Sequence, residues 1–213
     1  MTSKPTQDRH RAKRLALSNP NEALRLARDI EDHWFRCQAL ALVAYRCESA
    51  AMRASAITEA FQAGWELGAV NRVVVASSWP LKVLCRKGGT ERLEDEVRRL
   101  LAIMDTDASP VRRAESLDFV LGALVTAARE LFWQAYERME EACAAPLHGG
   151  KRNVKGEALL VHWMPVLHAF DPARAEAALA AIHGPVLAER ARANIAQHPH
   201  VNPEKWISRP SLD

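Results

Sequence analysis

The sequence lacks the features that mark membrane-spanning, secreted and disulfide-bonded proteins. No window of its 213 residues approaches the roughly 18 uninterrupted apolar residues of a membrane span, and the charged N-terminal stretch has no apolar core of the signal-peptide kind. We therefore expect a cytoplasmic protein with no membrane association. The cysteines show no CxxC pairing and fall inside apolar helical patterns, which favours small buried hydrophobic residues. These are Cys37, Cys47, Cys85 and Cys143.

Signals for β-strands are also scarce. No hairpin dipeptide stands between alternating apolar runs, and the β-branched cluster Val73-Val74-Val75 lies inside a longer helical pattern. Elsewhere apolar residues recur at helical spacing, as in the stripe formed by Leu93, Val97, Leu100 and Met104. The spacing predicts an all-α protein.

Two kinds of helix alternate along the chain. One kind is amphipathic and is expected over residues 21–31, 51–66, 91–104, 130–145 and 172–183. The other is apolar on almost all sides and is expected over residues 35–47, 70–86, 111–127, 155–169 and, more weakly, 186–197. A helix that is apolar all round must be covered on several sides. The alternation therefore predicts stacked antiparallel helix pairs, as an α-solenoid (α-α superhelix) of about four and a half helical hairpins or a compact bundle of the same repeats.

Charge is distributed unevenly between the N-terminus and the rest of the chain. The net charge is +3, whereas residues 1–20 carry five basic residues and one acidic residue, so the remaining chain has a charge of 3 − 4 = −1. We expect a basic N-terminal arm and first helix over 1–19, a helical repeat domain over 20–197, and a C-terminal tail over 198–213. In the tail, Trp206 and Ile207 are expected either to fold back over the last repeat or to form a short linear motif for a partner.

Helix starts are marked by a capping residue followed by proline. The pairs are Asn19-Pro20, Ser109-Pro110 and Asp171-Pro172. A basic residue opens each of the first four apolar helices, at spacings of 36, 41 and 42 residues, which is the range of helical-hairpin repeats. The four residues are Arg36, Arg72, Arg113 and Lys155.

The stretch Asp107–Ala114 resembles the junction of a HEAT repeat, in which an Asp-containing turn leads into Val-Arg at the start of the second helix. Ile30–Arg36 is similar to a second copy, and Asp171–Ala175 carries the cap and the proline. The resemblance, to the wider class of HEAT, armadillo and TPR proteins, covers residues 20–197. It implies a superhelical stack with a binding surface and no particular ligand.

Two sets of residues are candidates for that binding surface. Trp34, Trp79 and Trp163 could be interface anchors, since aromatic residues dominate interface energetics, or could pack between repeats. The four basic residues could form a stripe for phosphates or for an acidic partner. Alternatively, each could pair with a nearby turn acid such as Asp32 or Asp107, because a cation at a helix start opposes the helix dipole. The candidates are Trp34, Arg36, Arg72, Trp79, Arg113, Lys155 and Trp163.

Catalytic and metal-binding patterns are absent from the sequence. No set of histidines and cysteines has credible zinc spacing, and no serine or cysteine carries a nucleophile signature. The glycine-basic loops at residues 86–90 and 149–152 lack the spacing of a phosphate-binding loop. We expect no catalytic residue, no metal and no cofactor.

Three functions remain open. The first is a protein-interaction or scaffolding module that binds a protein partner on the face of the apolar, inner helices. The second is a nucleic-acid-binding solenoid that uses the basic N-terminal arm and the arginine ladder. The third is a small enzyme with a pocket near Trp79 and Trp163.

Overall fold

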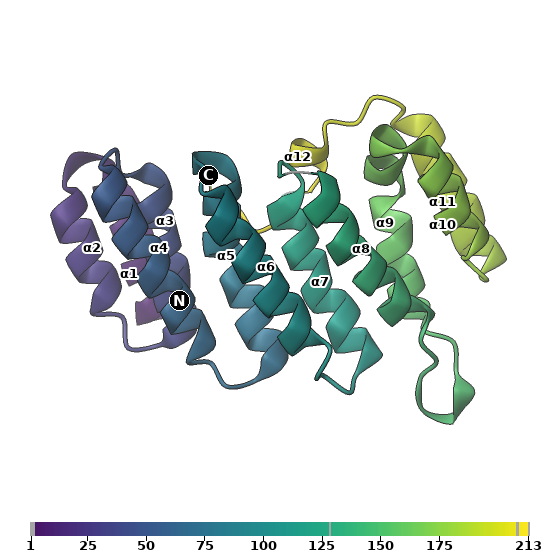
Figure 1. Ribbon diagram of the computed structural model, residues 1–213, viewed down its shortest axis with the longest axis horizontal. Coiled ribbons are helices and arrows are strands. Elements are labelled where there is room, and N and C mark those ends of the chain that lie inside the picture. The colour runs from purple at the N-terminus through teal and green to yellow at the C-terminus, as the bar shows by residue number, and fades with distance from the viewer. Residues whose placement is uncertain (1–2, 128, 208, 213) are drawn as a thin grey trace. The chain divides into compact units, whose positions relative to one another are not determined.

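The computed structural model describes residues 3–127, 129–207 and 209–212 (Figure 1). Within these residues the chain is helical and contains no β-strand, which confirms the predicted all-α fold of packed helix pairs. No helix in this part of the chain is both long enough and apolar enough to cross a membrane. The helices are α1 (Lys4–Ser18), α2 (Pro20–Arg28), α3 (His33–Arg46), α4 (Ala50–Trp65), α5 (Val70–Lys87), α6 (Thr90–Met104), α7 (Pro110–Leu124), α8 (Arg129–Ala144), the 3-10 helix η1 (His148–Gly150), α9 (Val154–Phe170), α10 (Pro172–Ala180), α11 (Pro185–Gln197) and α12 (Pro203–Trp206).

The chain forms two compact units. Unit 1 contains residues up to Ile103 together with the segment that begins at Pro210, and unit 2 contains Met104–Arg209. Residues 210–212 therefore pack with the first half of the chain.

In unit 1, α1, α3 and α5 pack in succession, and α2 and α4 pair with α1 and α3. Helix α3 buries every residue from Cys37 to Ala44, as expected for a helix covered on several sides. Helix α1 buries Ala12 and Ala16 against this layer. The basic N-terminal residues are thus carried by a packed inner helix and do not project as an arm.

The predicted caps are present at the helix starts. The Asn19 side chain accepts from Glu22 N, Ser109 accepts from Arg112 N, and Asp171 accepts from Ala173 N and Arg174 N. A side-chain oxygen at this position satisfies an N–H group that the helix leaves unpaired.

In unit 2, α7 pairs with α8 and α9 pairs with α10, while α7, α9 and α11 pack in succession. An aromatic cluster fills its core. The ring of Phe132 lies 5.3 Å from Trp133, 5.8 Å from Trp163 and 5.0 Å from Phe170, measured between centroids. Edge-on and tilted ring pairs of this kind add to the energy of burial.

Candidate functional site

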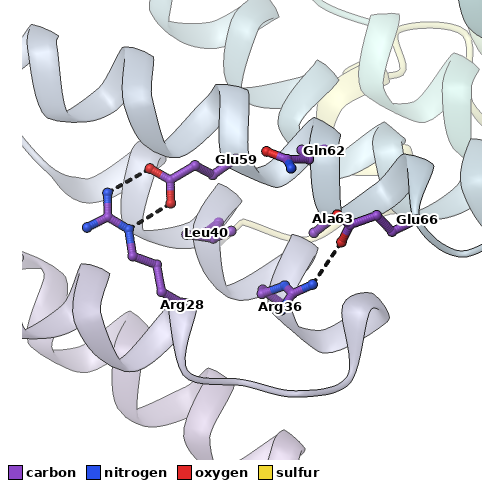
Figure 2. A pocket seen from close by; sticks show the side chains of 7 residues that line it. All are labelled: Arg28, Arg36, Leu40, Glu59, Gln62, Ala63 and Glu66. Carbon is purple, nitrogen blue, oxygen red and sulfur yellow. Dashed lines mark hydrogen bonds and ion pairs between the residues drawn. The ribbon is translucent and has the colours of Figure 1, made fainter.

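A polar pocket of about 270 Å³ opens in unit 1 between α2, α3 and α4 (Figure 2). Leu40 and Ala63 provide its apolar lining, and both are almost fully buried. The polar lining residues are Arg28, Arg36, Glu59, Gln62 and Glu66.

Each charged residue of this pocket is paired with an opposite charge. Arg28 donates to both carboxylate oxygens of Glu59 at 2.7 Å, and Arg36 donates to Glu66 at 2.9 Å (Figure 2). The Nδ1 atom of His33 also lies 2.9 Å from Glu66. Bonding to Arg28 lowers the pKa of Glu59. The pocket is therefore a set of ion pairs that join α2 and α3 to α4, and it offers no unpaired charge for a ligand.

Two of the predicted site residues in unit 1 lie close together, Trp34 on α3 and Arg72 on α5. The Arg72 guanidinium is exposed and lies 5.9 Å from the Trp34 ring centroid. Arg36 turns instead to Glu66, whereas the expected partner Asp32 caps α3 by accepting from Trp34 N. A cap satisfies the helix start locally, so the arginine bonds a more distant acid.

Trp79 is half-buried on α5 and lines neither of the two cavities described for this chain. Its neighbour Pro80 lies inside the helix and is buried. Nothing in this geometry brings Trp79 together with the Trp34 and Arg72 pair.

In unit 2, Trp163 is fully buried, which rules out a surface anchor at this position. Its indole N–H donates to Asp118 at 2.7 Å. The packing alternative for Trp163 is therefore the one observed.

The two basic residues predicted in unit 2 do not form a stripe of free cations. Lys155 lies 3.8 Å from Glu115. The expected partner of Arg113, Asp107, is bonded instead by Arg112, at 2.7 Å. Bonding by Arg112 lowers the pKa of Asp107, with a smaller electrostatic contribution from Arg113. Asp107 therefore pairs with an arginine, as predicted, but the arginine is Arg112 and not Arg113.

The cysteines are not activated as nucleophiles. Burial raises the pKa of the Cys85 and Cys143 thiols to about 12, and it also raises the pKa of the Cys37 thiol. A thiol needs a lowered pKa to react readily at neutral pH. Among the described residues, no group of three or more histidine, cysteine, aspartate or glutamate side chains could hold a metal ion.

A second cavity, of about 200 Å³, lies in unit 2 between the end of α8, the loop through η1 and the start of α9. Glu157 on its wall is 5% exposed, and its Oε1 atom lies 3.1 Å from Arg152 Nε. Burial raises the pKa of Glu140, which also lines the cavity. The acids and bases here compensate one another, so the cavity has no strong charge preference.

The C-terminal segment, residues 202–212, shows how a polypeptide can bind the inner helices. In unit 2, α12 packs against α9 (Figure 1). The Trp206 indole N–H donates to the His162 carbonyl at 3.0 Å, and its ring stacks on the His162 ring with centroids 6.0 Å apart. The following residue, Ile207, is 4% exposed.

Gly122 on α7 provides the space for this segment. A Cβ atom at position 122 would overlap the carbonyl oxygen of Arg209 and would lie 2.9 Å from Ile207 Cγ2. The three atoms nearest to that position all belong to Ile207 and Arg209. The main chain can approach α7 this closely only because residue 122 has no side chain. We call the surface formed by Phe119, Gly122 and His162 the inner-helix face of unit 2.

An acidic side chain and an aromatic ring of α7 lie close to this segment in space. Burial raises the pKa of Asp118, and the Trp163 hydrogen bond and the charges of His162 and Arg209 oppose that shift. The Arg209 guanidinium also lies 6.0 Å from the Phe119 ring centroid. The exposed cation of the segment therefore lies near an aromatic ring of this face.

The final residues of the segment are held within unit 1. Lys82 on α5 is 2% exposed, and its ammonium donates to the Pro210 carbonyl at 2.7 Å. Pro210 and Leu212 are buried. Here again an inner helix holds the segment through a main-chain carbonyl.

Sequence reasoning did not identify Gly122 and Lys82 as binding residues. Each stands alone inside an apolar run, Gly122 in FVLGALV and Lys82 in PLKVLC. An isolated glycine in a helix lowers its stability and therefore calls for a packing or functional reason. A lysine flanked by apolar residues calls for a buried partner in the same way. A glycine and a lysine inside apolar helical runs were therefore the sequence features that could have pointed to these two binding residues.

Comparison with known proteins assigns neither a family nor a function to this face. No family model matches the sequence, and no curated protein and no solved structure shows significant similarity to the chain.

Proposed function

We propose that the protein is an interaction module whose inner-helix face binds an extended segment of a partner protein. The observation that carries the proposal is that this face of unit 2 already holds a polypeptide segment, because Trp206 bonds α9 while Ile207 and the Arg209 carbonyl lie against Gly122 of α7. A HEAT-like α-solenoid in the cytoplasm, acting as a scaffold, is the setting that this proposal assumes.

The contacts on this face suit peptide binding. A helix carbonyl accepts from an indole, a glycine admits the main chain, and an aromatic ring lies beside a guanidinium. Aromatic and arginine side chains supply much of the binding energy in protein interfaces. The contact between Gly122 and the peptide main chain would be possible for many peptide sequences. The contacts made by the aromatic residue and the cation would select among those sequences.

The two alternative functions have less support. Nucleic-acid binding would depend on exposed Lys4, Arg11 and Arg14 of α1, because Arg9 bonds Gln38 and lies over Phe35. Of the basic ladder, two members lie beside glutamates. An enzyme pocket near the two predicted tryptophans has no support from either cavity, since neither is lined by them.

Selection from a library of random peptides tests the proposal. The full chain and its Ile207→Asp variant, in which the cis segment is released, would both serve as targets. Enriched peptides should slow hydrogen exchange at the backbone amides of α7 and α9. If neither target enriches a sequence, or if protection is confined to other helices, the inner-helix face is not a peptide-binding site.

A further inference from the structure

The C-terminal segment occupies the inner-helix face of unit 2 by contacts that a separate peptide could reproduce. Trp206 bonds a main-chain carbonyl, Ile207 and the Arg209 carbonyl fill the space at Gly122, and the Arg209 guanidinium lies near Phe119. We infer that this segment is an intramolecular stand-in for the partner. The partner it replaces is a peptide that presents an aromatic residue, an aliphatic residue and a cation in the same order. This inference rests on the proposed function.

Position 122 argues for a binding role of this contact. Glycine is among the poorest helix formers, and Gly122 stands in the last turn of α7, two residues before the helix ends at Leu124. Its nearest neighbours at the missing Cβ belong only to the segment. A glycine whose missing Cβ would overlap the segment is explained by docking of the segment at that position.

Covalent attachment gives the segment an advantage over a free partner. A tethered ligand competes at an effective concentration in the millimolar range. A free peptide with a dissociation constant near 100 µM would therefore bind the full chain about ten-fold more weakly than a chain whose segment is released. The partner must outcompete the segment, so the segment sets a threshold for binding.

The first experiment measures binding of a labelled, amidated peptide of residues 201–209 by fluorescence anisotropy. Ile207→Asp releases the cis segment and leaves α7 and α9 unchanged, and Trp206→Ala is a second releasing variant. Both should bind the peptide about ten-fold more tightly than the wild-type chain. Val186→Asp is the matched control, since Val186 is 76% exposed on α11, and it should bind as the wild type does.

The second experiment blocks the face itself. The Gly122→Ala variant should keep the helical circular dichroism spectrum of the chain but should displace the segment. Displacement is measured as faster trypsin cleavage after Lys205. Trypsin does not cut after Arg209, because proline follows it. Glu115→Ala, on the exposed side of the same helix, is the control and should leave the cleavage rate unchanged. The double variant Gly122→Ala, Ile207→Asp should bind the peptide at least ten-fold more weakly than Ile207→Asp alone.

Three results would overturn the inference. These are equal peptide affinity in the wild type and both releasing variants, undiminished binding in the double variant, and no saturable binding to a folded Ile207→Asp chain below about 1 mM peptide. If library peptides bind α7 and α9 while the 201–209 peptide does not, the inference fails and the proposed function stands. If no peptide binds, both fail.

Discussion

Unit 1 and unit 2 use the same alternation of helices, and both contain interhelix ion pairs, but unit 2 adds a cluster of packed aromatic rings. In unit 1, ion pairs connect α2 and α3 to α4, and guanidinium groups lie over rings of α4, as Arg92 does over Phe61 and Arg99 over Trp65. In unit 2, Arg174 likewise lies over Trp133, and rings also pack on rings around Phe132. The comparison shows that a helix-pair pattern specifies where helices pack and leaves the chemistry of packing open.

This difference predicts unequal responses to mutation and to solvent. A buried ring cluster loses both burial and packing when one ring is removed, whereas exposed ion pairs are weakened by salt and contribute little. Four predictions test the comparison, in order of decreasing expected effect.

Removing the fully buried tryptophan of unit 2 should have the largest effect. Trp163→Ala creates a cavity beside Phe132 and leaves Asp118 without its indole donor. The free energy of unfolding should fall by about 3–5 kcal/mol, measured by urea denaturation. Trp34→Ala, at a half-buried ring in unit 1, should cost less than half as much. Equal losses would contradict the contrast between the units.

The ion pair between the buried Asp107 and Arg112 in unit 2 should contribute an intermediate amount. Asp107 is 7% exposed, accepts from Ser109 N and is bonded by Arg112. Asp107→Asn should lower the free energy of unfolding by about 1–2 kcal/mol at pH 7. Because the folded pKa of Asp107 is lowered, this contribution is present above its ordinary pKa and is lost as the pH falls through the lowered value. A loss that persists unchanged in strong acid would contradict the assignment.

The ion pair in the unit 1 pocket should contribute less. A double-mutant cycle with Arg28→Ala and Glu59→Ala should give a coupling free energy of about 0.2–1 kcal/mol, since the Arg28 side chain is 49% exposed. The coupling should shrink between low salt and 1 M salt because ions screen exposed charges. A coupling free energy that does not change with salt would contradict the prediction and would show that this ion pair is shielded from solvent.

The smallest effect should be a change in pH dependence at Asp118. Its folded pKa is raised by burial, so the folded state holds more protons, and stability falls as the pH rises from the ordinary pKa through the raised one. Asp118→Asn keeps an acceptor for Trp163 and removes this loss. The unfolding midpoint of the variant relative to the wild type should therefore increase between acidic and neutral pH. A constant difference across that range would show that Asp118 does not titrate in the folded state.

Local patterns were sufficient to predict much of the fold. The caps at Asn19 and Asp171 act within three residues of the helix starts that they satisfy. The apolar pattern of residues 35–47 predicts a covered helix, and α3 is covered. Such features depend on neighbours in the sequence, so the sequence contains the signal for them.

The candidate site could not be predicted from the sequence, because its contacts join residues that are far apart in the chain. Arg36 bonds Glu66, thirty residues later, because the nearer Asp32 is used as a cap. The segment at Gly122 is recognised through main-chain atoms, which are the same in every sequence. The division of the chain into two units likewise follows from packing between distant residues.

Residues 210–212 complete unit 1 although about a hundred residues of unit 2 precede them. At ribosomal rates of about 5–20 residues per second, that intervening stretch takes on the order of 5–20 s to synthesise. For this interval a newly made unit 1 has left the ribosome without the Pro210 carbonyl that Lys82 binds. A nascent chain therefore exposes a docking position that the finished chain fills, and chaperones or other nascent chains can reach it only during synthesis.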